Sequence, residues 1–298
     1  MDFQVLANSK SGVVLGSIIG GKFPSVLSYP LINFVARRLA RSKTSPMVQV
    51  VRNNQKIVHG GPLSSISLDK LVEEVFVHAG RCFVDLYKNY NNPEALQRKI
   101  YVSEDIEKLI RLSQGDNFGA FLVVPHMSNF DLMLLAVAAR GFKAKVLTLG
   151  NPTGGYKFQN EIRATSGLDI MPVSRRANIN ALRTLQNGGI VLAGIDRPIR
   201  EKGRKLSFFG RPSPLSDGYI RMALRADVPV LVANVYMDED GIYQTGLSEP
   251  VTMTRMDDSA MEVRYNAEKV LSVIEDCIRC HPTQWQMYYP VWPDVVDF

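Results

Sequence analysis

The chain has 298 residues, of which 46% are hydrophobic and 21% charged, so it can bury a large core, and collagen-like, disordered and disulfide-dependent classes are excluded. The formal net charge is +6, but residues 1–68 hold eight basic and one acidic side chains, whereas the rest of the chain holds 27 basic and 28 acidic ones. Because the excess charge is confined to the N-terminal segment, the sequence argues against a general nucleic-acid binder.

Residues 1–68 are expected to form a basic, helical arm at a membrane interface. The segment 23–36 is uncharged and contains three aromatic side chains, and the basic cluster Arg37-Arg38-Leu39-Ala40-Arg41-Ser42-Lys43 follows it. This pattern is typical of a helix lying on anionic headgroups, and the segment is too short to span a bilayer. The alternative is a buried helix with a solvated basic end.

Three cysteines cannot form a paired framework, which favours a reducing compartment. Together with the N-terminal arm, this favours the cytoplasmic face of the cell membrane, with peripheral or monotopic attachment.

Residues 69–298 are predicted to form one α/β domain. Residues 69–88 have helical spacing of apolar side chains, and Ser103 is expected to cap a second helix. Short apolar runs then alternate with helical segments, which predicts a mainly parallel central sheet flanked by helices. The predicted strands are 119–124, 145–149, 169–173, 190–195 and 229–236, and the predicted helices are 132–139, 158–166, 179–186 and 218–226. Ligands of such sheets bind at the carboxyl ends of the strands.

The first strand of this series ends in Pro125-His126-Met127-Ser128-Asn129-Phe130-Asp131. If Ser128 or Asn129 caps the next helix, Asp131 lies in its first turn and can fold back toward the imidazole. A carboxylate bonded to one ring nitrogen leaves the other free as a general base. The alternative is a structural histidine beside an aspartate that the helix dipole favours. No third ligand is spaced for a metal, so neither a metal nor a cofactor is expected.

A second strand end is followed by Asp196-Arg197-Pro198 and a strongly basic loop. Six basic side chains and one acidic one stand between residues 197 and 211. These are Arg197, Arg200, Lys202, Arg204, Lys205 and Arg211, with Glu201. Beside a site at the carboxyl edge of the sheet, this density indicates a phosphate-bearing substrate, the alternative being a solvated basic loop.

These landmarks together resemble the glycerolipid and lysophospholipid acyltransferase superfamily, which shares the H-x4-D motif of His126 and Asp131. The resemblance covers about residues 70–290 and is strongest to the bacterial branch of lipid A late acyltransferases and phosphatidylinositol mannoside acyltransferases. It also rests on Asn151, Arg163, Gly167, Asp196-Arg197, Phe208-Phe209-Gly210-Arg211-Pro212 and Pro282-Thr283-Gln284-Trp285, where the branch has P-E-Q-W. Lipid A enzymes usually carry Glu at position 131, so Asp131 favours mannoside-type or glycerolipid-type relatives, while the glycerolipid block E-G-T-R is absent.

The resemblance implies an acyltransferase-like fold and an O-acyltransferase that moves a fatty acyl chain from acyl-CoA or acyl carrier protein to a hydroxyl of a lysophospholipid or glycolipid. It implies His126 as general base, Asp131 as the carboxylate that orients it, and Arg163 near the site. Asp196 and Arg197 would serve the acceptor, with Glu201 a rival for the carboxylate role. We add Asn129, Arg200, Arg204 and Arg211 as substrate-binding candidates. The expected partners are the thioester donor, a lipid acceptor and an anionic membrane surface, without nucleic acid.

Other functions have weaker support in the sequence. A non-catalytic lipid-binding protein on the same scaffold is the main alternative. A hydrolase is disfavoured because no G-x-S-x-G motif is present. The segment Cys277-Ile278-Arg279-Cys280-His281 spells a c-type haem attachment motif, but the helical spacing of apolar residues before it favours the last turn of an ordinary helix.

Overall fold

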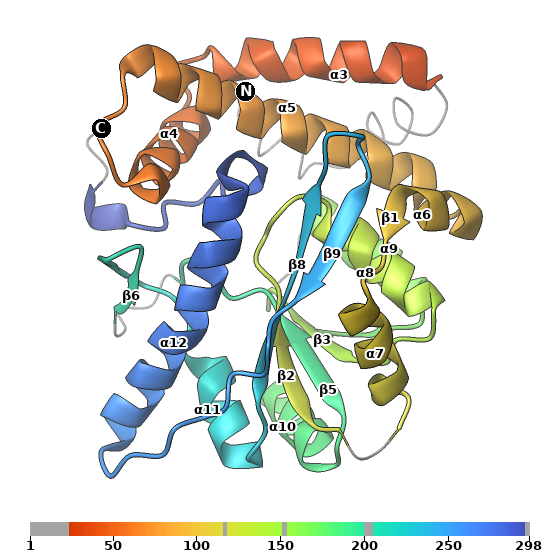
Figure 1. Cartoon of the computed structure of the whole chain (residues 1–298), viewed down its shortest axis with the longest axis vertical. Helices are drawn as coiled ribbons and strands as arrows, with labels where there is room; N and C mark the ends of the chain where they lie inside the picture. Colours follow the sequence, from red (N-terminus) through yellow and green to blue (C-terminus); the bar gives the residue numbers. More distant parts are fainter. Residues whose placement is uncertain (1–23, 116–117, 151–153, 200–204, 296–298) are drawn as a thin grey trace.

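The computed structural model describes residues 24–115, 118–150, 154–199 and 205–295. A seven-stranded sheet with the order β1-β9-β8-β2-β5-β3-β4 forms its centre, with helices on both faces (Figure 1). Its strands are β1 Ile100–Tyr101, β2 Ala120–Val123, β3 Lys145–Thr148, β4 Asp169–Pro172, β5 Ile190–Ala193, β8 Val230–Met237 and β9 Tyr243–Leu247. All neighbours pair in parallel except β8 and β9, which confirms the predicted mainly parallel sheet.

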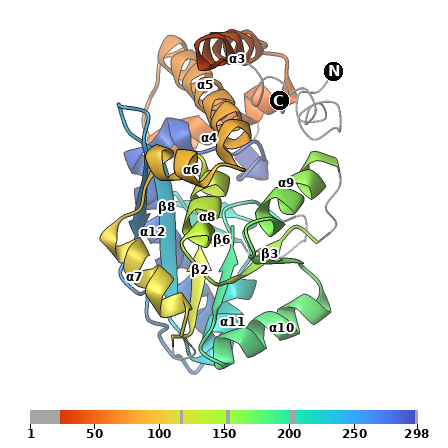
Figure 2. The same ribbon diagram turned by 90° about the vertical axis from the view of Figure 1, so that its right-hand side faces the viewer.

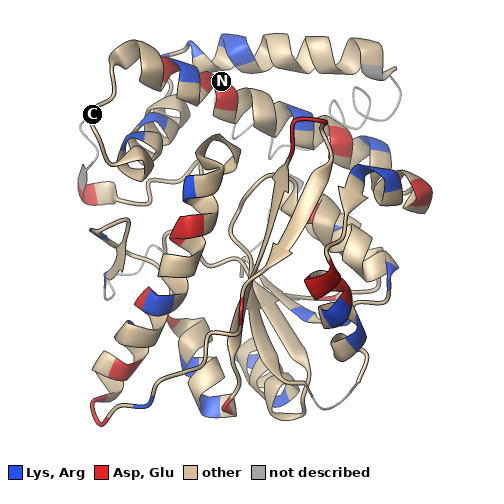
Figure 3. Ribbon diagram, in the orientation of Figure 1, with Lys and Arg blue, Asp and Glu red and all other residues tan. Residues whose placement is uncertain are grey.

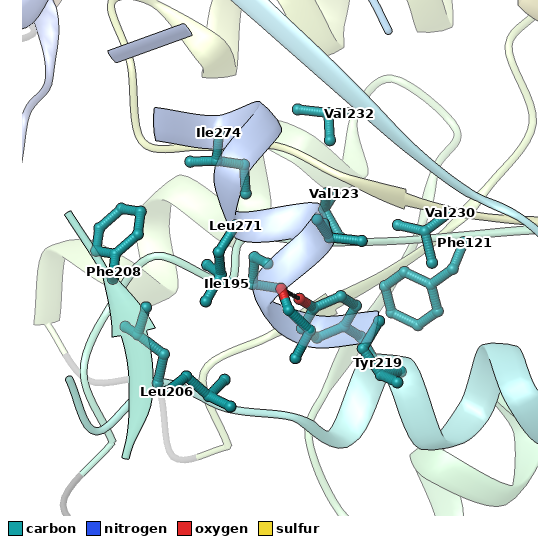
Figure 4. Close-up of a cluster of buried hydrophobic side chains, with 14 of the residues drawn as sticks. Phe121, Val123, Ile195, Leu206, Phe208, Tyr219, Val230, Val232, Leu271 and Ile274 are labelled. Atoms are coloured by element: carbon teal, nitrogen blue, oxygen red, sulfur yellow. Dashed lines mark hydrogen bonds between the residues drawn. The ribbon is translucent and has the colours of Figure 1, made fainter. Parts of the chain in front are cut away.

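The central strands are apolar throughout because both of their faces are covered. Along β2, Phe121 and Val123 belong to one buried cluster (Figure 4), whereas Leu122 belongs to the cluster on the opposite face. Continuous apolar runs of this kind are typical of parallel strands between two helical layers. One layer contains α7 Glu104–Ser113, α8 Phe130–Ala139 and α9 Gly154–Ala164; the other contains α10 Arg175–Gln186, α11 Gly218–Ala226 and α12 Ser259–Cys280.

Most predicted elements occur in the structure, and α11 has the predicted bounds. Ser103 caps α7 as expected, with its side chain accepting a hydrogen bond from the amide of Ile106. The basic loop after β5 was predicted without structure, but part of it forms a hairpin of β6 Leu206–Phe208 and β7 Arg211–Ser213. Phe209 and Gly210 both have positive φ, as a two-residue type I′ turn requires.

The chain leaves β2 and β5 in opposite directions, so the order of the strands reverses at their carboxyl ends. From β2 it passes through α8 to β3, on one side of β5; from β5 it passes through the hairpin and α11 to β8, on the other side of β2. The two connections lie on opposite faces of the sheet (Figure 2). In open α/β sheets, ligands bind where the chain direction reverses in this way.

Three helices precede the sheet: α3 Ser25–Ala40, α4 Pro46–His59 and α5 Ser65–Asn89, with α6 Pro93–Lys99 after them. α3 lies along α5 in both ribbon views (Figures 1 and 2). On α4, the side chains of Asn54 and Gln55 donate hydrogen bonds to the main chain of Met287 and Pro282 near the C-terminus. The boundary at residue 68 falls within α5, and residues 1–23 of the expected arm lie outside the described residues.

The basic cluster at the end of α3 lies beside acidic residues of α5 (Figure 3). Arg37 and Arg41 both pair with Glu73, and Lys43 pairs with Asp69. These contacts neutralise part of the charge that the sequence alone assigned to a membrane surface. On the N-terminal side of these cations, the exposed face of α3 is apolar, at Val26, Leu27, Leu31, Phe34 and Val35. None of the described helices combines the length and apolar character needed to span a bilayer.

Candidate active site

His126 and Asp196 lie side by side at the carboxyl ends of β2 and β5. The two strands are parallel neighbours in which Val123 is opposite Ala193, so residues three positions further along each strand face one another. The imidazole Nδ1 is 2.5 Å from Oδ1 of Asp196, and the amide N–H of His126 donates to Oδ2 at 2.9 Å. Because the carboxylate accepts from Nδ1, the proton of a neutral ring resides there and Nε2 is free to act as a base.

The carboxylate of Asp196 is completely buried and receives a third hydrogen bond, from the indole Nε1 of Trp285 at 2.8 Å. Burial opposes its ionisation, but the charge of His126 and the bonds from His126 and Trp285 outweigh burial and hold the pKa of Asp196 below its ordinary value. Asp196 is therefore an ionised carboxylate that fixes the ring of His126.

From the sequence we expected Asp131 to have this orienting role, but the structure gives Asp131 a different partner. Asp131 lies in the first turn of α8, as predicted, but its Oδ1 accepts from Nε of Arg163 on α9 at 2.6 Å. Arg163 is only 5% exposed; burial acts against its charge, and the facing Asp131 carboxylate raises the pKa of this guanidinium above its ordinary value. Asp131 pairs with Arg163 because a buried guanidinium needs an opposite charge. The position beside His126 is occupied by Asp196, because β5 is the neighbour of β2 in the sheet.

Arg163 and Arg197 lie at the edge of the site, and the guanidinium group of each contacts aromatic rings. The guanidinium of Arg163 lies 5.7 Å from the ring centre of Phe130, which in turn meets His126 edge-on at 5.2 Å. Arg197 stacks over Tyr289 at 4.5 Å and lies 5.8 Å from Tyr156. Its Nε is buried and has no hydrogen-bond partner among the described residues. Arg197 thus retains an unused donor next to the residue that orients His126.

The remaining candidates divide into those that the structure describes and those that it does not. Asn129 caps α8 by accepting from the amide of Leu132, and its amide group donates to the main chain of Cys82, so its bonds within the protein hold the loop. Arg211 is exposed on the β6–β7 hairpin. Five residues named from the sequence lie outside the described residues, namely Asn151, Arg200, Glu201, Lys202 and Arg204.

The loop that carries His126 is held closely on two sides. Ser128 adopts a φ of 42°, a strained conformation for a residue with a side chain, and its amide donates to the carbonyl of Gln284 at 2.7 Å. The amide of Gln286 donates to the carbonyl of His126 at 2.8 Å. Below the ring, a Cβ on Gly194 would come within 2.7 Å of Cε1 of His126, so only glycine leaves room for the imidazole in this position.

The candidate site also contains four residues that the sequence did not indicate: Trp285, Gly194, Tyr156 and Tyr289. Trp285 stands in the Pro282–Trp285 motif, but its position in the sequence carries no sign of its partner. Gly194 comes two positions before Asp196, and a glycine at a strand end is compatible with many roles. Their contacts depend on segments that are distant in the chain.

Comparison with known proteins shows which family has this sequence. A profile of the bacterial lipid A biosynthesis acyltransferases matches residues 9–293. The chain belongs to this family. The membership confirms the acyltransferase resemblance and places both His126 and Trp285 within the family region.

The chain is also similar to curated proteins that are named for another lipid. The chain is 22% identical over 182 residues to phosphatidylinositol mannoside acyltransferase of two Mycobacterium tuberculosis strains. The match takes in 58% of this chain but only 54% of that relative, so it spans about half of the relative's length. Among solved structures, the 1-acyl-sn-glycerophosphate acyltransferase PlsC of Thermotoga maritima aligns with 84% of this chain and 97% of its own, at a TM-score of 0.37 and 14% identity.

Proposed function

We propose that this protein is an O-acyltransferase in which His126 is the general base and Asp196 the carboxylate that orients it. The observation that carries the proposal is the contact of 2.5 Å between Nδ1 of His126 and the buried Asp196, which leaves the other ring nitrogen, Nε2, available as a base. In a family of acyltransferases, a base in this setting activates a hydroxyl.

The reaction follows from these groups. Nε2 of His126 takes the proton of an acceptor hydroxyl while the oxygen attacks the carbonyl carbon of a thioester. The tetrahedral intermediate then expels the thiolate, which takes the proton from the imidazolium, so the products are an ester and a free thiol. Asp196 stabilises the imidazolium while it exists, and it stays ionised throughout.

The substrates are proposed as an acyl-CoA or acyl carrier protein donor and a lipid acceptor with a phosphate near its hydroxyl. Support for the phosphate comes from the unused Nε of Arg197 and from the basic sequence that follows it. The name of the mycobacterial relative favours a glycolipid acceptor over a lysophospholipid one. Arg163 is proposed to have a structural role as the partner of Asp131 and not to bind substrate, because it is buried and paired.

The test is acyl transfer by the purified full chain, followed as thioester consumption and by mass spectrometry of the lipid product. His126→Ala should lower turnover by about 10²- to 10⁴-fold. His59→Ala removes an exposed histidine at the end of α4 and should leave turnover unchanged. Full transfer by His126→Ala would disprove the base assignment. A wild-type protein that binds lipid without consuming thioester would instead be the non-catalytic lipid-binding protein.

We further propose that the exposed face of α3 docks the protein on the cytoplasmic face of the membrane. Val26, Leu27 and Phe34 are 81%, 58% and 70% exposed, which is unusual for large apolar side chains on one helix. Phe34→Asp should reduce flotation with anionic phospholipid vesicles. Met261→Asp is the control, because Met261 is 62% exposed in the first turn of α12, and α12 begins at the end of the molecule away from α3 (Figure 1). Equal flotation of the two variants would contradict a docking face on α3.

A further inference from the structure

The C-terminal segment 284–286 forms part of the support of the active site. Its main chain pairs with the His126 loop through the bonds of Gln284 and Gln286, and Met127 and Trp285 form an isolated antiparallel bridge. The side chain of Gln286 adds a bond to the carbonyl of Ser128 at 2.8 Å. The ring of Trp285, which is 1% exposed, is thereby fixed beneath the loop and directs its N–H at Asp196.

We propose that Trp285 is a positioning residue for the acyl transfer: its indole N–H holds Oδ2 of Asp196 so that Oδ1 stays aligned with His126. The inference rests on the proposed function. Oδ2 has two donors, the indole of Trp285 and the amide of His126, and Oδ1 has the imidazole. A carboxylate with these three bonds cannot rotate away from the ring, so Nε2 keeps one direction.

The indole also moderates the charge that His126 experiences. A hydrogen bond to a carboxylate draws negative charge toward the donor, so the carboxylate attracts the imidazolium less strongly. Without the indole N–H, His126 would hold its proton more tightly and would remain inactive as a base up to a higher pH. Among the described residues, the charged or titratable groups on the elements packed around His126 include Asp196, Arg197, Asp131, Arg163, Tyr156, Tyr289, His78 and Cys82. The indole N–H of Trp285 donates to Asp196.

The chain offers a matched control in its second tryptophan. Trp292 is 2% exposed, lies in the same aromatic cluster with its ring 6.2 Å from that of Trp285, and donates its indole N–H to the carbonyl of Phe208. Trp292→Phe and Trp285→Phe therefore remove the same donor from equally buried rings. They differ in that only Trp285 has a bond to Asp196.

The first experiment measures kcat/KM against pH for both variants of the full chain. Trp285→Phe should lower kcat/KM roughly tenfold and move the acid limb about half a pH unit or more to higher pH, while Trp292→Phe leaves the limb in place. Trp285→Tyr, whose hydroxyl can donate, should recover part of the loss. If both phenylalanine variants lose the same activity and neither moves the acid limb, the inference is wrong.

A second measurement needs no folded variant of Trp285. The sequence contains two tryptophans, so ¹⁵N-tryptophan labelling yields two indole signals, which Trp292→Phe assigns. The signal of Trp285 should shift with pH along the acid limb of the activity, and this shift should vanish in Asp196→Asn. A Trp285 signal that does not respond to pH would overturn the inference. Failure of the proposed function would appear separately, as activity retained in His126→Ala.

Discussion

Two buried carboxylates lie near the carboxyl ends of the central strands, and their partners distinguish their roles. Asp196 bonds to the imidazole of His126 at 2.5 Å, and Asp131 bonds to the guanidinium of Arg163 at 2.6 Å. The distances are alike, but an imidazole changes its charge near neutral pH whereas a guanidinium does not. A carboxylate beside a group that gains and loses a proton can stabilise the protonated form of that group. A carboxylate beside a permanent cation can only stabilise the folded structure.

The largest effect should come from Asp196→Asn. The amide is nearly the same size, but it can donate to Nδ1 and thereby favour the tautomer that carries its proton on Nε2, where the base must be free. We expect turnover to fall by about 10³-fold or more with little change in melting temperature. Circular dichroism melts and single-turnover acyl transfer test this together. Near-normal turnover would show that Asp196 does not orient the base.

Asp131→Asn should mainly affect stability, because it leaves the buried charge of Arg163 without its partner. Removal of one member of a buried ion pair costs about 3–5 kcal/mol. Urea denaturation measures this loss, and the double variant Asp131→Asn/Arg163→Met should regain most of it. Activity per folded molecule should decline far less than in Asp196→Asn. A stable but inactive Asp131→Asn protein would reverse the two roles.

His78 extends the comparison to a buried histidine without a carboxylate. Its Nε2 lies 2.9 Å from Oγ of Ser128, and burial, with a smaller effect of Arg81, lowers the pKa of His78 to about 4. Because the unfolded chain binds the proton first, this contribution to stability is complete above pH 6.5 and is lost as the pH falls toward 4. The loss should reach about 3 kcal/mol.

The measurement compares the free energy of unfolding of wild type and His78→Gln as a function of pH. Since the variant lacks the titrating group, the difference between the two proteins should change over this pH window. A constant difference would mean that His78 is not buried in its neutral form.

Gly194→Ala should have the smallest effect, and it tests how narrowly the His126 ring is placed. The added methyl group would lie 2.7 Å from Cε1, so the ring must move by several tenths of an ångström, and we expect kcat to fall roughly 10- to 100-fold. Gly61→Ala is the control, because its Cβ would meet nothing closer than a carbonyl oxygen at 3.9 Å. Unchanged kinetics in Gly194→Ala would show that the ring tolerates displacement.

The sequence by itself determined the local features of this protein. The alternation of apolar runs and helical spacing predicted the strands and helices of the α/β domain, because these patterns arise within a few residues. It also indicated both strand ends that carry the site, at His126 and at Asp196. The expected helix cap at Ser128 or Asn129 correctly placed Asp131 in the first turn of α8.

Only the tertiary structure decided which of these residues meet. The insertion of β5 between β2 and β3 brings Asp196 beside His126, and that strand order depends on pairing between segments 70 residues apart. The approach of Trp285, 89 residues beyond Asp196, depends on how the end of the chain packs under the loop. Local periodicity contains no information about such contacts, because their energy comes from burial and hydrogen bonds that form only once the whole domain is assembled.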